Sequence, residues 1–444
     1  MTAVKSVWRA SRLLGGSALV LGLVACSEPE EILRGERENL RAEGFVAQAT
    51  PLSPEGRAIS LPAARANIDW PQITGVSALR PGHPALSAAP VPAWDVSIGE
   101  GDSRRQRITA TPVVGDGRIY TLDSAAMVSA VSPAGQVLWQ RDLVPASEKG
   151  DQATGGGIAF DGGVVYISSG FGLLSALDAA SGAVIWQQEL EATGSGQPTV
   201  RDGLVYVVAG DDTGWAVQAK DGRIAWQIKG TPSPSNVLGA PAPAVTDELA
   251  IFAFGSGDVS VTFRRGGFQR WNASVAGERV GRTISRIADV TGAPVVAGNR
   301  VYLGNHSGRT VAFDLESGER LWTARHGAID PVWPVAGSLF LISDLGELVR
   351  LDAATGDTVW TSDLPGYLKD KPRKRGAIVA HHGPVLAGGQ IVVASNDGLL
   401  RFFDPETGGL LRSVAVSGGA STAPVVAGET LYVVSTKGQL HAFR

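Results

Sequence analysis

The sequence contains few of the residues on which thiol, metal or nucleophile chemistry depends. It has one cysteine, Cys26, so it cannot form an intramolecular disulfide. Its six histidines are scattered, and the adjacent pair His381 and His382 would point to opposite faces of a strand, which favours structural or surface roles. The patterns G-x-S-x-G, G-x-x-x-x-G-K-[ST], H-E-x-x-H and C-x-x-C are absent. These absences argue against catalysis, and a formal net charge of −4 gives no electrostatic reason to expect nucleic-acid binding.

Glycine, in contrast, is abundant and regularly placed. The stretch 176–186 reads A-L-D-A-A-S-G-A-V-I-W, which is typical of a strand, a tight turn and a second strand that carries a tryptophan. Similar stretches recur along the chain, and in each a glycine lies four residues before the last position. The last positions are Trp139, Trp186, Trp226, Trp271, Trp322, Trp360 and Arg412, and the glycines are Gly135, Gly182, Gly222, Gly267, Gly318, Gly356 and Gly408. Arg412 therefore stands where the pattern predicts a tryptophan.

Each copy follows a Pro-Val-Val or similar run, a glycine turn and, in most copies, a tyrosine-bearing run, as at 293–304 and 423–434. The unit therefore predicts four short strands, which is typical of a blade of a β-propeller. A four-stranded sheet cannot bury both faces alone, so blades must stack around an axis, and the tryptophan is expected to pack between neighbours. The glycines at 155–157 are interpreted as a loop before a strand rather than a phosphate site.

The two ends of the repeat region complement each other. Trp94 lies one period before Trp139 but lacks the three preceding strands, whereas the C-terminus supplies three strands near 424–427, 430–435 and 439–444 and then stops. Joining them makes one composite blade and removes exposed sheet edges. We therefore predict an all-β fold, an eight-bladed propeller of four-stranded antiparallel blades spanning residues 93–444.

The N-terminus has the features of a targeting segment. Lys5, Arg9 and Arg12 precede an apolar run that is too short to span a bilayer, and the segment ends in L-V-A-C. This ending resembles a bacterial lipobox, which implies a signal peptide over 1–25, lipid attachment at Cys26 and, since Ser27 follows, the outer membrane. The alternative is an ordinary signal peptide with an incidental cysteine. Residues 26–92 lack periodicity and are expected to form a flexible tether, although Trp70 and Ile73 are available to dock on the domain.

The A-x-D-x-x-[ST]-G-x-x-x-W unit resembles the tryptophan-docking (PQQ-like) repeat of quinoprotein dehydrogenases and their relatives. Within that superfamily the lipobox, the charged tether, the I-G-E-G stretch at 98–101 and the eight blades are similar to the BamB family. The resemblance implies a non-catalytic periplasmic scaffold, anchored by lipid, that assists the insertion of β-barrel proteins into the outer membrane. It implies BamA, the barrel-inserting subunit, and other components of the BAM complex as partners, with unfolded outer-membrane proteins as further candidates.

Two alternatives stay open at this stage. Quinoprotein dehydrogenases stack pyrroloquinoline quinone against a disulfide of adjacent cysteines and add a Ca²⁺ site, and the single cysteine of this chain excludes that disulfide. We therefore expect no cofactor and no metal. A periplasmic propeller scaffold of another kind would have the same fold, because propeller function resides in loops.

Two long connections are the candidate partner surface. They span 231–243 and 276–292 and follow the tryptophan strands of neighbouring units. The resemblance implies that these loops dock on the POTRA repeats of BamA. The residues expected to make the contact are Val237, Leu238, Arg286 and Asp289.

Overall fold

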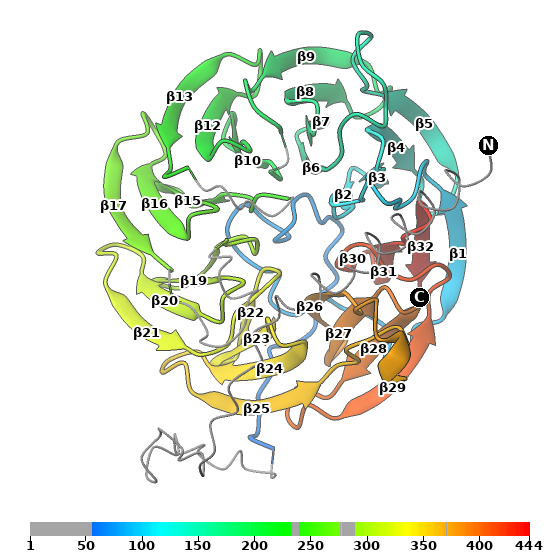
Figure 1. Cartoon of the computed structure of the whole chain (residues 1–444), viewed down its shortest axis with the longest axis vertical. Coiled ribbons are helices and arrows are strands. Elements are labelled where there is room, and N and C mark those ends of the chain that lie inside the picture. The colour runs from blue at the N-terminus through cyan, green and yellow to red at the C-terminus, as the bar shows by residue number, and fades with distance from the viewer. Residues whose placement is uncertain (1–55, 195, 233–238, 276, 278–288, 370) are drawn as a thin grey trace, which may run out of the picture. The chain divides into compact units, whose positions relative to one another are not determined.

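The computed structural model describes residues 56–444, apart from 195, 233–238, 276, 278–288 and 370. Contacts group Leu52–Arg444 into one unit, and its described part contains eight four-stranded antiparallel sheets arranged as blades around a central axis (Figure 1). The fold class predicted from the repeat is thereby confirmed.

The blades follow the chain from the axis outwards, each with its innermost strand first. Blades 1 to 4 are β2 (Val113–Gly115), β3 (Arg118–Leu122), β4 (Met127–Val131), β5 (Val137–Asp142); β6 (Gly156–Asp161), β7 (Val164–Ser169), β8 (Leu173–Asp178), β9 (Val184–Glu189); β10 (Thr199–Arg201), β11 (Leu204–Val208), β12 (Thr213–Gln218), β13 (Ile224–Lys229); and β14 (Ala244–Val245), β15 (Leu249–Ala253), β16 (Asp258–Phe263), β17 (Gln269–Ser274). Blades 5 to 8 are β18 (Val295–Ala297), β19 (Arg300–Gly304), β20 (Thr310–Asp314), β21 (Arg320–Ala324); β22 (Trp333–Val335), β23 (Ser338–Ile342), β24 (Glu347–Asp352), β25 (Thr358–Asp363); β26 (His381–Ala387), β27 (Gln390–Ser395), β28 (Leu399–Phe403), β29 (Leu410–Ala415); and β30 (Val425–Ala427), β31 (Thr430–Val434), β32 (Gln439–Phe443), with β1 (Pro92–Ser97) outermost.

Blade 8 is the predicted composite of both chain ends. β1 pairs antiparallel with β32, and Trp94 lies opposite Ala442. The backbone pairing continues beyond the strands, since Val91 and Arg444 exchange two N–H to carbonyl hydrogen bonds of 2.7 and 3.0 Å. The sheet that closes the ring is therefore hydrogen-bonded in the same way as the other seven.

Burial follows the position of a strand in its blade. The second and third strands are almost wholly buried, for example Ile119–Leu122 in β3, whereas outer strands such as β9 alternate between exposed and half-buried residues. This difference arises because the inner strands are covered on both faces by neighbouring blades, while the outer strand is the sheet edge and meets solvent.

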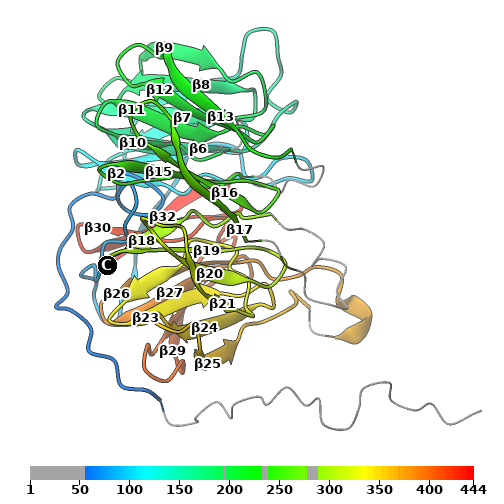
Figure 2. The ribbon, with the colours of Figure 1, turned by 90° about the vertical axis from the view of Figure 1, so that its left-hand side faces the viewer.

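Residues 56–91, which the sequence assigns to a flexible tether, lie against the propeller in the structure. Trp70 is 1% exposed and its ring packs against that of Trp333 at 6.2 Å. The segment runs along one face of the ring (Figure 2). The chain has too little apolar periodicity to order itself, but it gains backbone partners from strands that are already in place.

Residues 67–84, which we call the strap, hydrogen-bond to all eight blades in turn. Gly428 N–H donates to Asn67 O in blade 8 at 2.7 Å, and Trp70 N–H donates to Val114 O in blade 1 at 2.8 Å. The remaining contacts run in blade order: Phe160 N to Pro71 O, Gln72 Nε2 to Val200 O, Val245 N to Ser77 O, Val296 N to Ala78 O, Trp333 Nε1 to Gly82 O and Gly388 N to Pro84 O, all between 2.8 and 3.2 Å. The strap therefore closes one end of the central channel.

The opposite face carries the connections from each outer strand to the inner strand of the next blade. We call it the loop face. The two faces correspond to the two ends of the inner strands. These connections enter at the N-terminal ends, whereas the strap bonds near the C-terminal ends.

Candidate functional site

The tryptophans of the repeat join neighbouring blades. In seven junctions the indole lies against the turn glycine of the next blade, and all seven glycines have positive φ between 69° and 84°. The distances from an added Cβ to the tryptophan ring are 2.6–2.7 Å, so only glycine fits in this position. The pairs are Trp94 with Gly135, Trp139 with Gly182, Trp186 with Gly222, Trp226 with Gly267, Trp271 with Gly318, Trp322 with Gly356 and Trp360 with Gly408.

Each of these indoles also makes a hydrogen bond across the junction. Trp186 Nε1–H donates to Ala219 O at 2.8 Å, and Trp271 Nε1–H donates to Leu315 O at 2.9 Å. The other five make the same kind of bond to a carbonyl of the next blade, at 3.1–3.3 Å. One side chain thus supplies apolar area and satisfies its polar atom at once.

The aspartates of the repeat stabilise the turns that receive the tryptophans. Asp314 Oδ1 accepts hydrogen bonds from Ser317 N–H at 2.8 Å and Ser317 Oγ–H at 2.9 Å. These bonds lower the pKa of Asp314 below its usual value of 3.8. Asp178 has the same arrangement with Ser181. These carboxylates have a structural role, as the Asx-turn pattern predicts.

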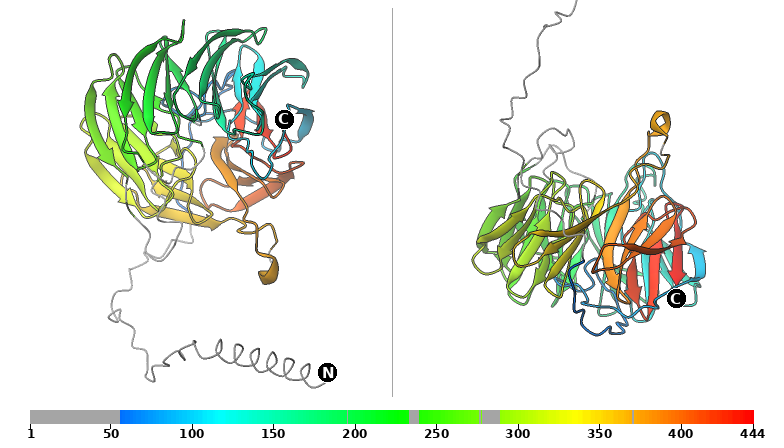
Figure 3. Two further views of the ribbon diagram at one scale, coloured as in Figure 1. Left: turned by 45° about the horizontal axis from the view of Figure 1, so that its top comes forward. Right: turned by 90° about the horizontal axis from the view of Figure 1, so that it is seen from below.

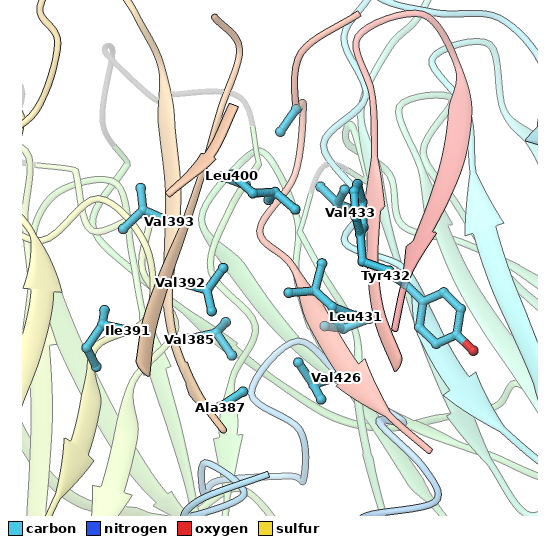
Figure 4. Close-up of a cluster of buried hydrophobic side chains, with 14 of the residues drawn as sticks. Val385, Ala387, Ile391, Val392, Val393, Leu400, Val426, Leu431, Tyr432 and Val433 are labelled. Atoms are coloured by element: carbon cyan, nitrogen blue, oxygen red, sulfur yellow. The ribbon is translucent and has the colours of Figure 1, made fainter. Parts of the chain in front are cut away.

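The junction between blades 7 and 8 is different. Arg412 occupies the tryptophan position, and its guanidinium carbon lies 3.7 Å from the centre of the Phe402 ring. The outer strands of blade 8, β32 and β1, are not consecutive in the chain, so no turn joins them for an indole to contact. Aliphatic side chains fill the interface instead, with Val385, Val392 and Leu400 of blade 7 facing Val426 and Leu431 of blade 8 (Figure 4).

The central channel holds a cavity of about 200 Å³ beside the strap. Arg80 closes it, with Nη2–H donating to Pro331 O at 2.6 Å and its guanidinium lying 4.8 Å from the Trp333 ring centre. Burial lowers the pKa of Arg80 to about 9, and the charge of Asp330 opposes this shift. Asp330 itself accepts a hydrogen bond from Gly383 N–H at 2.7 Å. The charged groups at this end of the channel already have protein partners.

The cavity does not fit the quinone cofactor of the dehydrogenases that share the repeat. Among the described residues its lining contains Thr109, Gln197, His306 and His382 but neither a tryptophan nor a cysteine on which a planar ring could stack. Burial lowers the pKa of His306, which favours its neutral form. Among the described residues, no three histidine, cysteine, aspartate or glutamate side chains gather as a metal site. Nor does the described chain contain a helix with the length and hydropathy of a membrane span.

The predicted partner residues are only partly within the described chain. Cys26, Val237, Leu238 and Arg286 lie outside it. Asp289 is described, and its side chain is 3% exposed, whereas a solvent-facing position on a loop rim is expected from the sequence. Its carbonyl accepts a hydrogen bond from His306 N–H at 3.1 Å, beside the channel. In this conformation the Asp289 side chain is not exposed to a partner.

The structure also reveals a surface feature that the repeat pattern did not single out. The connection between β25 and β26 on the loop face contains a short hairpin at 366–378, with a 3-10 turn, η2 (Pro372–Lys374). The run K-D-K-P-R-K-R at 369–375 is its sequence signal. The repeat pattern does not mark this run, because it lies between repeats and has no counterpart in the other units.

These features define a propeller of tryptophan-docked blades whose channel is sealed at one face. A family model described as "Outer membrane protein assembly factor BamB" matches residues 124–362 and 346–444, and the chain belongs to this family. It is similar to outer membrane protein assembly factor BamB of Yersinia pestis, with 27% identity over 80% of this chain and 89% of the relative. BamB of Escherichia coli is 26% identical, over 80% of this chain and 88% of the relative.

Solved structures share the fold. The crystal structure of BamB from Moraxella catarrhalis superposes with a TM-score of 0.67 at 19% identity and covers 80% of this chain and 100% of that one. The quinohemoprotein alcohol dehydrogenase of Comamonas testosteroni reaches a TM-score of 0.64 at 15% identity, over 86% of this chain and 81% of that one. Fold alone therefore does not separate the two classes. Membership of the BamB family separates the two classes, and it assigns the chain to the assembly factors rather than to the enzymes.

Proposed function

We propose that this chain is a non-catalytic assembly factor for outer membrane proteins and works as a component of the BAM complex. The match to the BamB family over most of the propeller is the observation that carries the proposal. The lining of the channel supports it, because its charged residues Arg80 and Asp330 are engaged by the protein itself and the described lining does not suit the quinone of the related dehydrogenases. The fold supplies a rigid ring on which loops are presented.

Native-membrane crosslinking followed by identification of the attached chains tests this function. The expected result is recovery of BamA or another BAM component, together with lower levels of outer-membrane barrel proteins when the gene is deleted. Recovery of a redox enzyme partner, or a quinone absorption spectrum in the purified protein, would contradict the proposal and favour the dehydrogenase alternative.

The docking surface that we propose is the loop face, through the connections 231–243 and 276–292. The strands that flank them begin or end on that face, and an apolar stretch beside charged residues has the mixed character of a protein interface. Since the Asp289 side chain is buried, reversing its charge would disturb the fold as well as any contact. Val237, Leu238 and Arg286 are the contact residues proposed here.

A double variant, Val237→Asp with Leu238→Asp, tests this surface. We expect loss of BamA from the purified complex, because two charges would have to be desolvated at the interface. The matched control is Leu410→Asp with Leu411→Asp, since these leucines are exposed on the outer strand β29, away from the loop face. Equal recovery of BamA with both double variants would exclude the proposed loop contact.

We further propose that the protein is held at the outer membrane by lipid on Cys26 and faces the periplasm. The lipobox-like sequence and the absence of any other cysteine support this. Cys26→Ser should yield unlipidated precursor that no longer fractionates with outer membranes, because stable attachment requires the acyl chains. Lipid labelling of the variant would contradict the anchor.

A further inference from the structure

The hairpin at 366–378 is an ordered projection rather than a loose connection. Val379 N–H donates to Gly366 O at 3.1 Å and Leu368 N–H donates to Ala377 O at 3.0 Å, which pairs its two arms. The hairpin stands out from the loop face, on the side opposite the strap (Figure 3). Its described residues therefore offer a convex surface instead of a pocket.

The tip of this hairpin is strongly cationic in a chain whose net charge is −4. Residues 369–375 contain five basic side chains and one acidic residue, Asp370, and the described positions among them are exposed. Lys369, Lys371, Arg373 and Lys374 make no ion pair with a described residue. Their charge is thus available to an anionic surface.

Apolar side chains flank the cations. Ile378 is 68% exposed, and Tyr367 and Leu368 beside it are also exposed. The Arg375 guanidinium lies 5.2 Å from the centre of the Tyr367 ring. The tyrosine therefore lies between the apolar residues at the base of the hairpin and the cations at its tip. Lysine and arginine with a neighbouring aromatic residue is the combination found at membrane–water interfaces.

We propose that the 366–378 hairpin binds the anionic phospholipid headgroups of a membrane surface. A convex cationic tip can contact a flat, mobile headgroup layer without a complementary shape, whereas a protein partner would need a concave acidic site. Juxtamembrane basic clusters are attracted to anionic lipids in this way, over about a Debye length. This proposal rests on the proposed function in one respect only, which is the identity of the membrane that the hairpin would contact.

The chain enters the propeller on the strap side of the ring, opposite the hairpin, so the tether must reach around the ring for both to meet one membrane. Arg57 pairs with Asp352 at 2.6 Å, and Arg350 Nη1–H donates to Arg57 O at 2.6 Å, so the described chain begins at blade 6. The hairpin is the connection from blade 6 to blade 7. Cys26 and position 56 are 30 positions apart in the sequence, and an extended chain of that length reaches roughly 100 Å. A lipid on Cys26 and the hairpin can therefore contact one membrane together.

Vesicle co-sedimentation tests the proposal with the unlipidated chain from Ser27 to Arg444, which contains the whole compact unit. The probes are vesicles of phosphatidylcholine alone and vesicles with one quarter phosphatidylglycerol. We expect binding to the anionic vesicles only, weakened by salt, and lowered at least about tenfold by Lys371→Glu with Lys374→Glu. Leu368→Ser with Ile378→Ser should lower it less.

The charge-matched control is Arg104→Glu with Arg105→Glu, which reverses two exposed cations elsewhere on the loop face. This variant should bind the anionic vesicles like the wild type. Free inorganic phosphate at the same phosphate concentration should not compete, because a single anion cannot engage several cations at once.

Three results would overturn the proposal: equal binding to both kinds of vesicle, no loss with the hairpin variant, or equal loss with the control. Binding of the hairpin to an acidic protein but not to vesicles would also overturn it. None of these results affects copurification with BamA, so the failure of this inference is distinguishable from failure of the proposed function.

Discussion

The seven tryptophan-docked junctions and the single junction between blades 7 and 8 solve the same packing problem differently. At a docked junction an indole covers a glycine turn and donates a hydrogen bond to it, as Trp271 does over Gly318. Between blades 7 and 8 the receiving turn is missing because β32 and β1 belong to opposite ends of the chain. Arg412 instead stacks on Phe402 within its own blade.

This difference shows that a tryptophan at this position goes with a receiving glycine turn in the next blade, and not with the structure of its own blade. Blade 7 has the same strands, the same Asx turn at Asp404 and the same glycine at Gly408 as its neighbours. Only the next blade differs. A break in the repeat therefore marks the seam of the ring.

The largest effect is expected from removing residues 93–98. This deletion takes out most of β1, including Trp94, and leaves blade 8 with three strands, so the junctions on both sides of it lose their outer contacts. Trp94 is half-buried, so its loss alone costs less than the ~3–5 kcal/mol of a fully buried tryptophan, and the lost strand adds to this. Deleting residues 27–55 is the control, and thermal unfolding followed by circular dichroism is the measurement. Equal melting temperatures would disprove closure by β1.

The next largest effect is expected when the side chain at a tryptophan-docked junction is removed, compared with removal of the arginine at the undocked junction. Trp271→Ala should reduce the free energy of unfolding by about 3–5 kcal/mol, since it empties the interface between blades 4 and 5. Arg412→Ala should cost about 1 kcal/mol, the typical scale of a cation–π contact. Urea denaturation measures both. Similar losses would show that the two junctions do not differ as described.

The receiving glycine gives a smaller and cleaner test. Gly318→Ala places a Cβ 2.6 Å from the Trp271 ring at φ +73°, whereas Gly337→Ala meets nothing within 4 Å at φ +71°. Both variants strain the backbone by about 1 kcal/mol, and only the first also displaces an indole. We expect Gly318→Ala to be the more destabilising by about 1–3 kcal/mol. Equal unfolding midpoints would mean that the turn alone matters.

The smallest effect concerns the charge in the turn. The hydrogen bonds from Ser317 lower the pKa of Asp314 in the folded state below its usual 3.8, so the carboxylate stabilises the fold above that pH. This contribution is lost as the pH falls through the folded-state pKa. Asp314→Ala should therefore lower the melting temperature slightly at neutral pH, and the difference from wild type should shrink below pH 3.8. A difference that grows on acidification would contradict the assignment.

The blades, their number and the composite closure could be predicted because each depends on local and repeated signals. Gly135, Gly182 and their equivalents mark turns that only glycine can form against an indole, and this requirement is visible in the spacing. The single strand at Trp94 and the three strands at 421–444 together make one blade, so counting strands is enough to locate the seam.

The strap could not be predicted in the same way. Its order comes from Val114, Val200, Val245 and other inner-strand ends that are distant in sequence, so no periodicity within 67–84 records it. The burial of Asp289 likewise depends on tertiary contacts, which residue types do not specify. The basic hairpin was visible as a charge run, but a search for repeats passes over a segment that occurs once.

The strap also has a consequence for the order in which the molecule can fold. It is made before every blade that it contacts, and Asn67 Nδ2–H donates to Val426 O, 359 residues further along the chain. Blades can assemble on their predecessors as they emerge, but the strap can take its place only after the last one exists. Trp70 can pack only once Trp333 of blade 6 exists, and such long-range closure is slow and leaves apolar surface exposed to aggregation. A protein proposed to help other chains fold would therefore itself complete its strap only late in folding, after the blades that hold the strap have formed.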